Sequence, residues 1–215
     1  MPMKNNREYR EMVLEVMAIE EPQEEDRKTV AGYATTFNEP YVLYEDGDIV
    51  FREQVAPGAF AEADMTDTIM QYNHEGRVFA RITNGTLRVK PDERGLYIEA
   101  DLGGTEIGRE LYDEIRGGYT DKMSFGFIVS DDEQLRTNAE DGRVDVLRTI
   151  TGISKLFDVS AVSIPANDGT SIGAQTRGRI DGVIEEVRAE RLEVERLNLE
   201  REKVKARVRA LGGNV

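Results

Sequence analysis

The sequence contains no cysteine, and it contains only one histidine, His74, among its 215 residues. The absence of cysteine excludes a disulfide framework, a thiolate zinc site and a cysteine nucleophile. A zinc hydrolase would need more histidine than this chain has, and no spacing of carboxylates suggests a Mg²⁺ site. We therefore expect neither a metal nor a cofactor, and any reaction that uses an imidazole must use His74.

Positive charge and long apolar runs are also scarce. The chain carries 28 Lys and Arg against 42 Asp and Glu, which gives a net charge of −14. Nucleic acids and anionic membranes reward positive charge, so neither is expected as a partner. There is no run of about 18 apolar residues, and the start, MPMKNNREYREM, is too polar for a signal peptide. The sequence thus predicts a soluble intracellular protein.

What the sequence does have is a long series of strand-like segments. Hydrophobic residues make up 39% of the chain, which is enough for a core. From residue 30 to about residue 172, short runs of β-branched and aromatic residues alternate with Gly, Pro, Asn and Asp. The runs GTLRVK and GLYIEADL, joined by PDER, predict a β-hairpin. We divide the chain into an N-terminal strand with an acidic loop (1–28), a β domain (29–174), and a C-terminal flexible loop and helix (175–215).

One segment of the β domain has a helical pattern instead. Ile107, Leu111 and Ile115 recur every four residues. Thr105 is a suitable N-cap, and Gly117 is a suitable C-terminal stop. Many strands with few helices predict a mainly β, α+β protein, either an antiparallel barrel or a sandwich with helices on its outside.

After Gly178 the composition changes to that of a long amphipathic helix. Positions taken in alternating steps of four and three from Val183 to Leu211 are apolar at seven of nine places, which is typical of a coiled-coil seam. An isolated helix gains little stability from propensity alone, so this one should pack on a partner. That partner is a second copy of the chain, meeting it through Val183–Leu211, a scaffold helix, or a helical segment of the capsid protein. The alternative is a helix that folds back onto its own β domain.

Two side chains are candidates for a nucleophile and its base. His74 lies where a strand pattern runs into a turn at Glu75–Gly76, and it is either a structural histidine or a catalytic one. Ser124 lies in KMSFGFIV, where strand alternation directs Met123, Phe125 and Phe127 into the core. Ser124 and Gly126 then share the opposite, almost bare face. That face either leaves a reactive hydroxyl exposed or belongs to an edge strand whose small residues meet solvent.

Asp158 is the third candidate, in the segment LFDVSAVSIPAN. Neither face of this segment is plainly polar, so it predicts a strand that is covered on both sides. A buried carboxylate there needs a cationic or hydrogen-bonding partner. An imidazole would serve, and so would Lys155, Arg148 or a backbone donor. Ser160 and Ser163 are rival hydroxyls, but their larger neighbours favour packing roles.

The order of three motifs, NHE, then MSFGF, then FDVSAVSIPAN, resembles that of the prohead maturation proteases of tailed phages. Those enzymes share a fold with assemblin, the herpesvirus capsid protease. The similarity extends to GYATTFNEPY, FREQVAPGAF, NGTLRVKPDERGLYIEADL and the helix before the serine. It covers residues 30–174, and the collinear order of its motifs makes it specific.

This resemblance implies a β-barrel serine protease that cuts scaffold and capsid-protein precursors, and often itself, inside the immature capsid in the host bacterial cytoplasm. Carried over to this sequence, the nucleophile is Ser124, the base is His74 and the third residue is Asp158. Assemblin uses a second histidine as its third residue, and this chain has none. Glu75 is the alternative acid, disfavoured because adjacent residues on an extended chain point apart. Activity should then rise with pH through about 6.5, unless the site shifts the pKa of the imidazole.

Two other functions compete with this one. The same fold could serve as a non-catalytic capsid-assembly module that acts through its C-terminal helix and contacts scaffold or capsid protein. A glycosidase built on paired carboxylates is the other, although a chain with 42 acidic residues offers such pairs by chance. The presence of a serine, a histidine and an acid in the family's order favours the protease.

Overall fold

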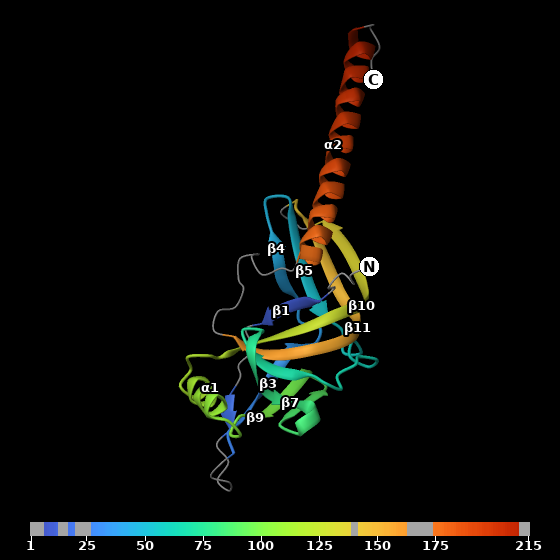
Figure 1. The fold of residues 1–215 in the computed structure, drawn as a ribbon. Helices are drawn as coiled ribbons and strands as arrows, with labels where there is room; N and C mark the ends of the chain where they lie inside the picture. Colours follow the sequence, from blue (N-terminus) through green and yellow to red (C-terminus); the bar gives the residue numbers. More distant parts are fainter. Residues whose placement is uncertain (1–6, 13–16, 20–26, 139–141, 163–173, 211–215) are drawn as a thin grey trace. The chain divides into compact units, whose positions relative to one another are not determined.

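The computed structural model describes residues 7–12, 17–19, 27–138, 142–162 and 174–210 (Figure 1). The chain divides into two compact units, Met1–Gln175 and Thr176–Val215. In the described residues the first unit is mainly β with one α-helix, and the second is a single helix. The predicted mainly β, α+β class is therefore confirmed. None of the described helices is long and apolar enough to cross a membrane.

The strands of the first unit form two sheets. The larger sheet has the order β1-β10-β11-β5-β4, and β6 joins it by pairing with β11 and β7. The smaller sheet has the order β2-β3-β9-β8. The bounds are β1 (Glu8–Met12), β2 (Met17–Ile19), β3 (Thr29–Thr36), β4 (Tyr41–Glu45), β5 (Ile49–Val55), β6 (Ile69–Tyr72), β7 (Glu75–Arg81), β8 (Leu87–Pro91), β9 (Gly95–Asp101), β10 (Lys122–Asn138) and β11 (Val144–Val162).

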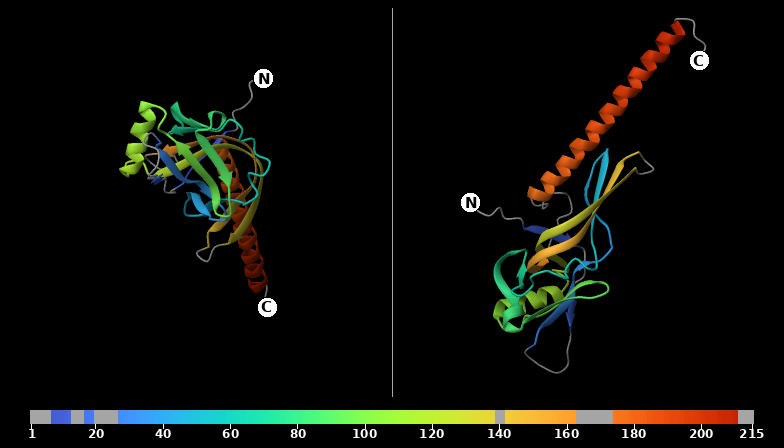
Figure 2. Two further views of the ribbon diagram at one scale, coloured as in Figure 1. Left: turned by 90° about the horizontal axis from the view of Figure 1, so that it is seen from below. Right: turned by 90° about the vertical axis from the view of Figure 1, so that its right-hand side faces the viewer.

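The pairing is mixed rather than purely antiparallel. The predicted hairpin of β8 and β9 is confirmed, and β10 and β11 run antiparallel side by side over most of their lengths (Figure 2). β11, however, pairs in parallel with β5 and again with β6. β11 itself is one continuous strand of 19 residues. Neither sheet closes on itself among the described residues, so the closed barrel stays a prediction.

The core lies where the two sheets and the first helix meet. Alternation along β10 buries Met123, Phe125 and Phe127 completely, as the pattern KMSFGFIV predicted. From the smaller sheet, Leu96 and Ile98 of β9 join the same cluster. Because alternate residues of a strand face opposite sides, this packing fixes the direction in which Ser124 points.

The two helices differ in how they are stabilised. α1 (Glu106–Arg116) begins at the predicted N-cap, where the Thr105 hydroxyl accepts from the backbone N–H of Gly108 at 3.1 Å. It buries Leu111 and Ile115. α2 (Ala174–Ala210) is one continuous helix that begins one residue before the segment 175–215, which the sequence assigned to a flexible loop and a helix. Exposed apolar side chains of α2 are Leu192, Val194, Leu197, Leu199 and Val204.

A buried ion cluster links β1 to the other strands of the larger sheet. The Arg148 guanidinium donates to Glu53 at 2.7 Å, to Glu8 at 3.1 Å and to Asp132 at 2.5 Å. Arg10 donates to Glu53 from Nη2 at 2.9 Å. Burial alone would raise the pKa of Glu53, but the two guanidinium groups outweigh it and hold that pKa below its ordinary value. Removing one member would leave its buried partners unpaired, so the cluster stabilises β1 in its place in the sheet.

Candidate active site

His74 is delivered by a tight turn between β6 and β7. Tyr72 and Glu75 pair across the hairpin, so Asn73 and His74 form its two-residue loop, with φ of 50° and 58°. Positive φ at both positions is the type I′ geometry that matches the twist of a hairpin. The turn expected at Glu75–Gly76 is therefore displaced by two residues. For His74 this backbone conformation costs about 1 kcal/mol, and the N–H of Asn73 holds the turn by donating to the carbonyl of Ala161 at 3.0 Å.

Ser124 lies inside the larger sheet, not at its edge. β1 flanks it on one side and β11 on the other, with Ser124 opposite Glu11 and Ser160. The sequence predicted an exposed hydroxyl, and this is wrong: Ser124 has no exposed surface. Its Oγ lies 2.9 Å from the backbone carbonyl oxygen of Arg10. The pattern of β10 does not reveal that β1 pairs with it. The exposure of Ser124 was misjudged for that reason.

Asp158 is fully buried on β11, directly opposite Gly126 of β10. A Cβ at position 126 would lie 2.4 Å from Oδ2 of Asp158 and 2.9 Å from Nε of Arg7. The Arg7 guanidinium pairs with that same Oδ2. The bare strand face predicted around Gly126 is thus filled by an ion pair, and any larger residue at this position would displace it.

The three predicted residues form one hydrogen-bonded chain. His74 Nδ1 is 2.5 Å from Asp158 Oδ1, and His74 Nε2 is 2.5 Å from Ser124 Oγ. An ionised carboxylate only accepts, so Nδ1 carries the proton and donates it to Asp158. Nε2 is then bare and accepts from the Ser124 hydroxyl. That hydroxyl has a single proton, so it can donate to His74 or to the Arg10 carbonyl, but not to both at once.

Aromatic and hydroxyl groups complete the surroundings of this chain. The Arg7 guanidinium lies over the ring of Phe157, 4.5 Å from its centroid, and over that of Tyr9 at 4.9 Å. The Tyr9 ring meets the imidazole edge-on, with centroids 4.4 Å apart. Ser160, for which the sequence favoured a packing role, instead donates a hydrogen bond to Asp158 Oδ1 at 2.9 Å. The sequence did not predict the roles of Arg7 and Tyr9. The one indirect sign of them was the glycine in MSFGF, which leaves room for a neighbouring side chain.

The competing assignments are placed elsewhere. Lys155 pairs with Asp64 at 3.0 Å, and Arg148 belongs to the buried cluster, so neither is the partner of Asp158. Glu75 is exposed. Ser163 lies outside the described residues. The carboxylate that contacts the imidazole is therefore that of Asp158.

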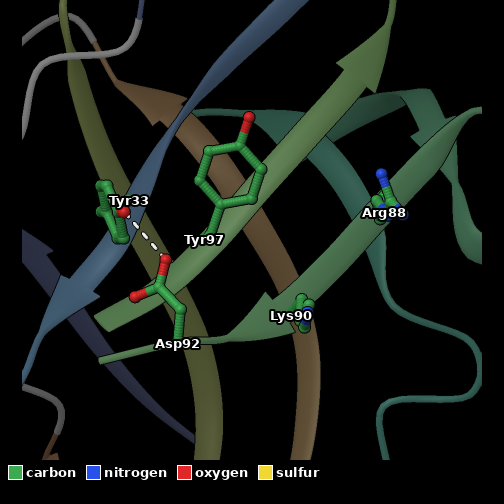
Figure 3. Close-up of a pocket in the computed structure, with 5 residues that line it drawn as sticks. All are labelled: Tyr33, Arg88, Lys90, Asp92 and Tyr97. Carbon is green, nitrogen blue, oxygen red and sulfur yellow. Dashed lines mark hydrogen bonds between the residues drawn. The ribbon is translucent and has the colours of Figure 1, made fainter. Parts of the chain in front are cut away.

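A separate pocket lies on the smaller sheet (Figure 3). It is lined by Tyr33, Arg88, Lys90, Asp92 and Tyr97, and the Tyr33 hydroxyl donates to Asp92 Oδ2 at 2.9 Å. It contains one carboxylate, whereas glycoside hydrolysis uses two, so it gives no support to a glycosidase. Within the part of the chain that the structure describes, no group of three or more potential ligands is arranged to hold a metal ion.

The electrostatic surroundings favour a neutral imidazole. Burial, and to a smaller extent the Arg7 guanidinium, lower the pKa of His74 to about 4. A histidine that acts as a general base must be neutral, so the base would be available at pH values well below the ordinary histidine pKa of about 6.5.

We predict that His74 becomes protonated only as the pH falls to about 4, and that Arg7→Gln raises its pKa by removing a nearby positive charge. Because the chain has no other histidine, NMR titration of histidine-labelled protein gives a single imidazole to follow. Arg94→Gln is the control, since that guanidinium lies over Tyr33 on the other sheet and should leave the titration unchanged. A wild-type midpoint at or above about 6.5 would contradict the burial argument.

A comparison with protein families agrees with this geometry. The model of the family described as caudovirus prohead serine protease matches residues 13–181. The matched span contains Ser124, His74 and Asp158. No curated protein and no solved structure matches the chain. Since the family match covers well over half of the sequence, the chain belongs to the caudovirus prohead serine protease family.

Proposed function

We propose that this chain is the serine endopeptidase that cleaves scaffold and capsid-protein precursors, and itself, during maturation of a phage prohead. In this proposal Ser124 is the nucleophile, His74 the general base and Asp158 the residue that orients the base. The observation that carries it is the unbroken chain of hydrogen bonds from Ser124 through His74 to Asp158. Membership of a family of phage serine proteases supports the same reaction.

The geometry suits proton transfer in both directions. As Ser124 Oγ attacks a peptide carbonyl, Nε2 of His74 takes the hydroxyl proton, and Asp158 stabilises the imidazolium that forms. The imidazolium then gives this proton to the leaving amine, and the peptide C–N bond breaks to leave an acyl-enzyme. In the second half, His74 takes a proton from a water molecule as its oxygen attacks the ester carbonyl. The bond between the acyl carbon and Ser124 Oγ then breaks, the imidazolium returns the proton to Oγ, and the carboxylic acid product leaves.

Access to the nucleophile requires movement. Ser124 has no exposed surface, and its hydroxyl lies within hydrogen-bond distance of the Arg10 carbonyl of β1. A substrate carbonyl reaches Oγ only when the groups around it have shifted, and β1 is the neighbour that competes directly for the hydroxyl proton. The described arrangement is therefore a resting state in this proposal.

In this proposal the enzyme acts inside the prohead, in the host cytoplasm, which its membership of a prohead protease family supports. Enclosure with scaffold and capsid protein would raise the effective concentration of substrate, so the enzyme need not be fast. Within such a shell the major capsid protein and the scaffold segments are the partners that we propose as substrates.

The first test concerns the nucleophile and the base. Ser124→Ala and His74→Ala should each lower kcat by about 10⁶-fold, and the double variant should be little worse, because members of a triad act as a unit. Mass spectrometry of the purified chain and of a peptide substrate would detect the cleavage. Fragments formed equally by wild type and Ser124→Ala would rule out this protease and favour the non-catalytic assembly module.

The second test concerns the acid. In Asp158→Asn the amide can present N–H to Nδ1 and so favour the wrong tautomer, which should lower kcat by about 10⁴-fold. Glu75→Gln removes an exposed carboxylate and should change kcat by less than about tenfold. Both variants are assayed on one peptide, with thermal unfolding as the check on folding. The reverse ranking would transfer the role to Glu75.

The C-terminal helix fits a role in association. Its seam residues Val194 and Leu197 and the off-seam Leu199 are all exposed. Exposed apolar side chains on a helix gain by packing against a matching seam. We include in the proposal that α2 binds a second copy of itself through Val183–Leu211. Within that range Val183 and Val187 are already buried, so Val194, Leu197 and Val204 would make the contact.

A pair of matched substitutions tests this association. Leu197→Lys places a charge on the seam and should weaken self-association at least about tenfold, whereas Leu199→Lys should leave it unchanged. Sedimentation at several concentrations measures both. A chain ending at Ala174 should keep its Ser124-dependent cleavage and lose the association. Equal effects of the two lysine variants, or a wild type that stays monomeric, would contradict the proposal.

A further inference from the structure

A pocket of about 330 Å³ lies between the β6–β7 hairpin and α1, beside the turn that carries His74. Its lining residues come from both elements. The hairpin supplies Tyr72, Glu75, Gly76, Arg77 and Phe79, and the helix supplies Ile107, Glu110, Leu111 and Glu114.

The lining has an apolar part and an acidic part. Phe79 and Ile107 are half-buried and Leu111 is buried, so they present hydrocarbon surface. Glu75, Glu110 and Glu114 are exposed, so their carboxylates meet water. With Arg77 as the one cation, the lining carries a net charge of about −2 at neutral pH. A complementary ligand has an apolar stem and a cationic head.

The three carboxylates are available to a ligand. In the described part of the chain, Glu75, Glu110 and Glu114 take part in no ion pair or side-chain hydrogen bond. Glu110 and Glu114 are four residues apart on α1, and like charges at that spacing repel. Glu114 also lies in the last turn, where the helix dipole disfavours an anion. The arrangement thus costs the free helix stability, and a bound cation would relieve both effects.

The position of the pocket links it to the proposed reaction. Tyr72 and Glu75 flank the two-residue loop that holds His74. On the other side, α1 ends at Arg116, and the chain enters β10, which carries Ser124, at Lys122. Both walls of the pocket are therefore continuous with segments that deliver the proposed base and nucleophile.

We propose that this pocket is a substrate subsite for a lysine or arginine side chain near the scissile bond. The inference rests on the proposed protease function and adds a substrate class to it. The aliphatic stem would pack on Phe79, Ile107 and Leu111, and the cationic head would meet Glu110 and Glu114. A neutral side chain of the same length would gain the apolar contact and lose the charge pairing.

The test compares two peptides, acetyl-Ala-Ala-Lys-Ala-Ala-amide and the same peptide with norleucine in place of lysine. The full chain carrying Ser124→Ala is used, so that it binds each peptide without cleaving it. Changes in the amide NMR shifts of the protein then show where the peptide binds. The lysine peptide should shift resonances of α1 and of the β6–β7 turn, and should bind at least about threefold more tightly than the norleucine peptide. When Glu110→Gln and Glu114→Gln are added to the Ser124→Ala chain, the two peptides should bind equally well.

The control keeps the same change in charge on the same helix but outside the pocket: Glu106→Gln with Asp113→Asn. This pair should retain the lysine preference. Equal binding of the two peptides, or equal losses in the two double variants, would overturn the subsite. Failure of the protease itself would appear differently, as cleavage by wild type that Ser124→Ala does not abolish, and would leave the binding preference intact.

Discussion

A carboxylate with no exposed surface is the constraint on which this site depends. Asp158 must be paired, because an isolated buried charge is too costly for a folded chain. Its oxygens are engaged by the Arg7 guanidinium, the His74 imidazole and the Ser160 hydroxyl. These partners come from the N-terminal segment, from the β6–β7 turn and from β11 itself. Pairing this one carboxylate therefore brings three distant parts of the chain together.

Space for that pairing is created by the absence of a side chain. Gly126 faces Asp158, and even a methyl group there would collide with Oδ2. The imidazole reaches the same region because Asn73 and His74 adopt positive φ, which costs energy that the hydrogen bonds of His74 offset. Both features are local departures from regular strand geometry. Both lie where Ser124, His74 and Asp158 approach one another within 3 Å. Departures from local backbone preference are expected where the geometry of a site requires them.

Local patterns predicted what local patterns can determine. The β8–β9 hairpin, the Thr105 cap and the burial of Phe125 follow from turn chemistry, capping and alternation over a few residues. The motif order identified Ser124, His74 and Asp158, and the structure brings them together. Long-range pairing was beyond such patterns: the parallel partners of β11 and the contact of Arg7 with a residue 151 positions away have no periodic signal. The exposure of Ser124 was misjudged for the same reason, since β1 is distant in sequence.

The N-terminal segment contacts both ends of the hydrogen-bonded chain. Its position therefore affects both the access of substrate to Ser124 and the pKa of His74. Its Arg7 pairs with Asp158, and its Arg10 carbonyl oxygen lies 2.9 Å from the Ser124 hydroxyl, where it competes with His74 for the hydroxyl proton. Displacing the whole segment would free the serine but would leave Oδ2 of Asp158 without its guanidinium, exposing the imidazole to an uncompensated negative charge. That charge would favour the imidazolium and so raise the pH at which a neutral base is available. A smaller shift, in which Arg10 leaves the hydroxyl while Arg7 stays on Asp158, would open the nucleophile and keep the base neutral. The buried Arg10–Glu53 pair, which anchors β1 independently of Arg7, is where such a partial movement would have to begin.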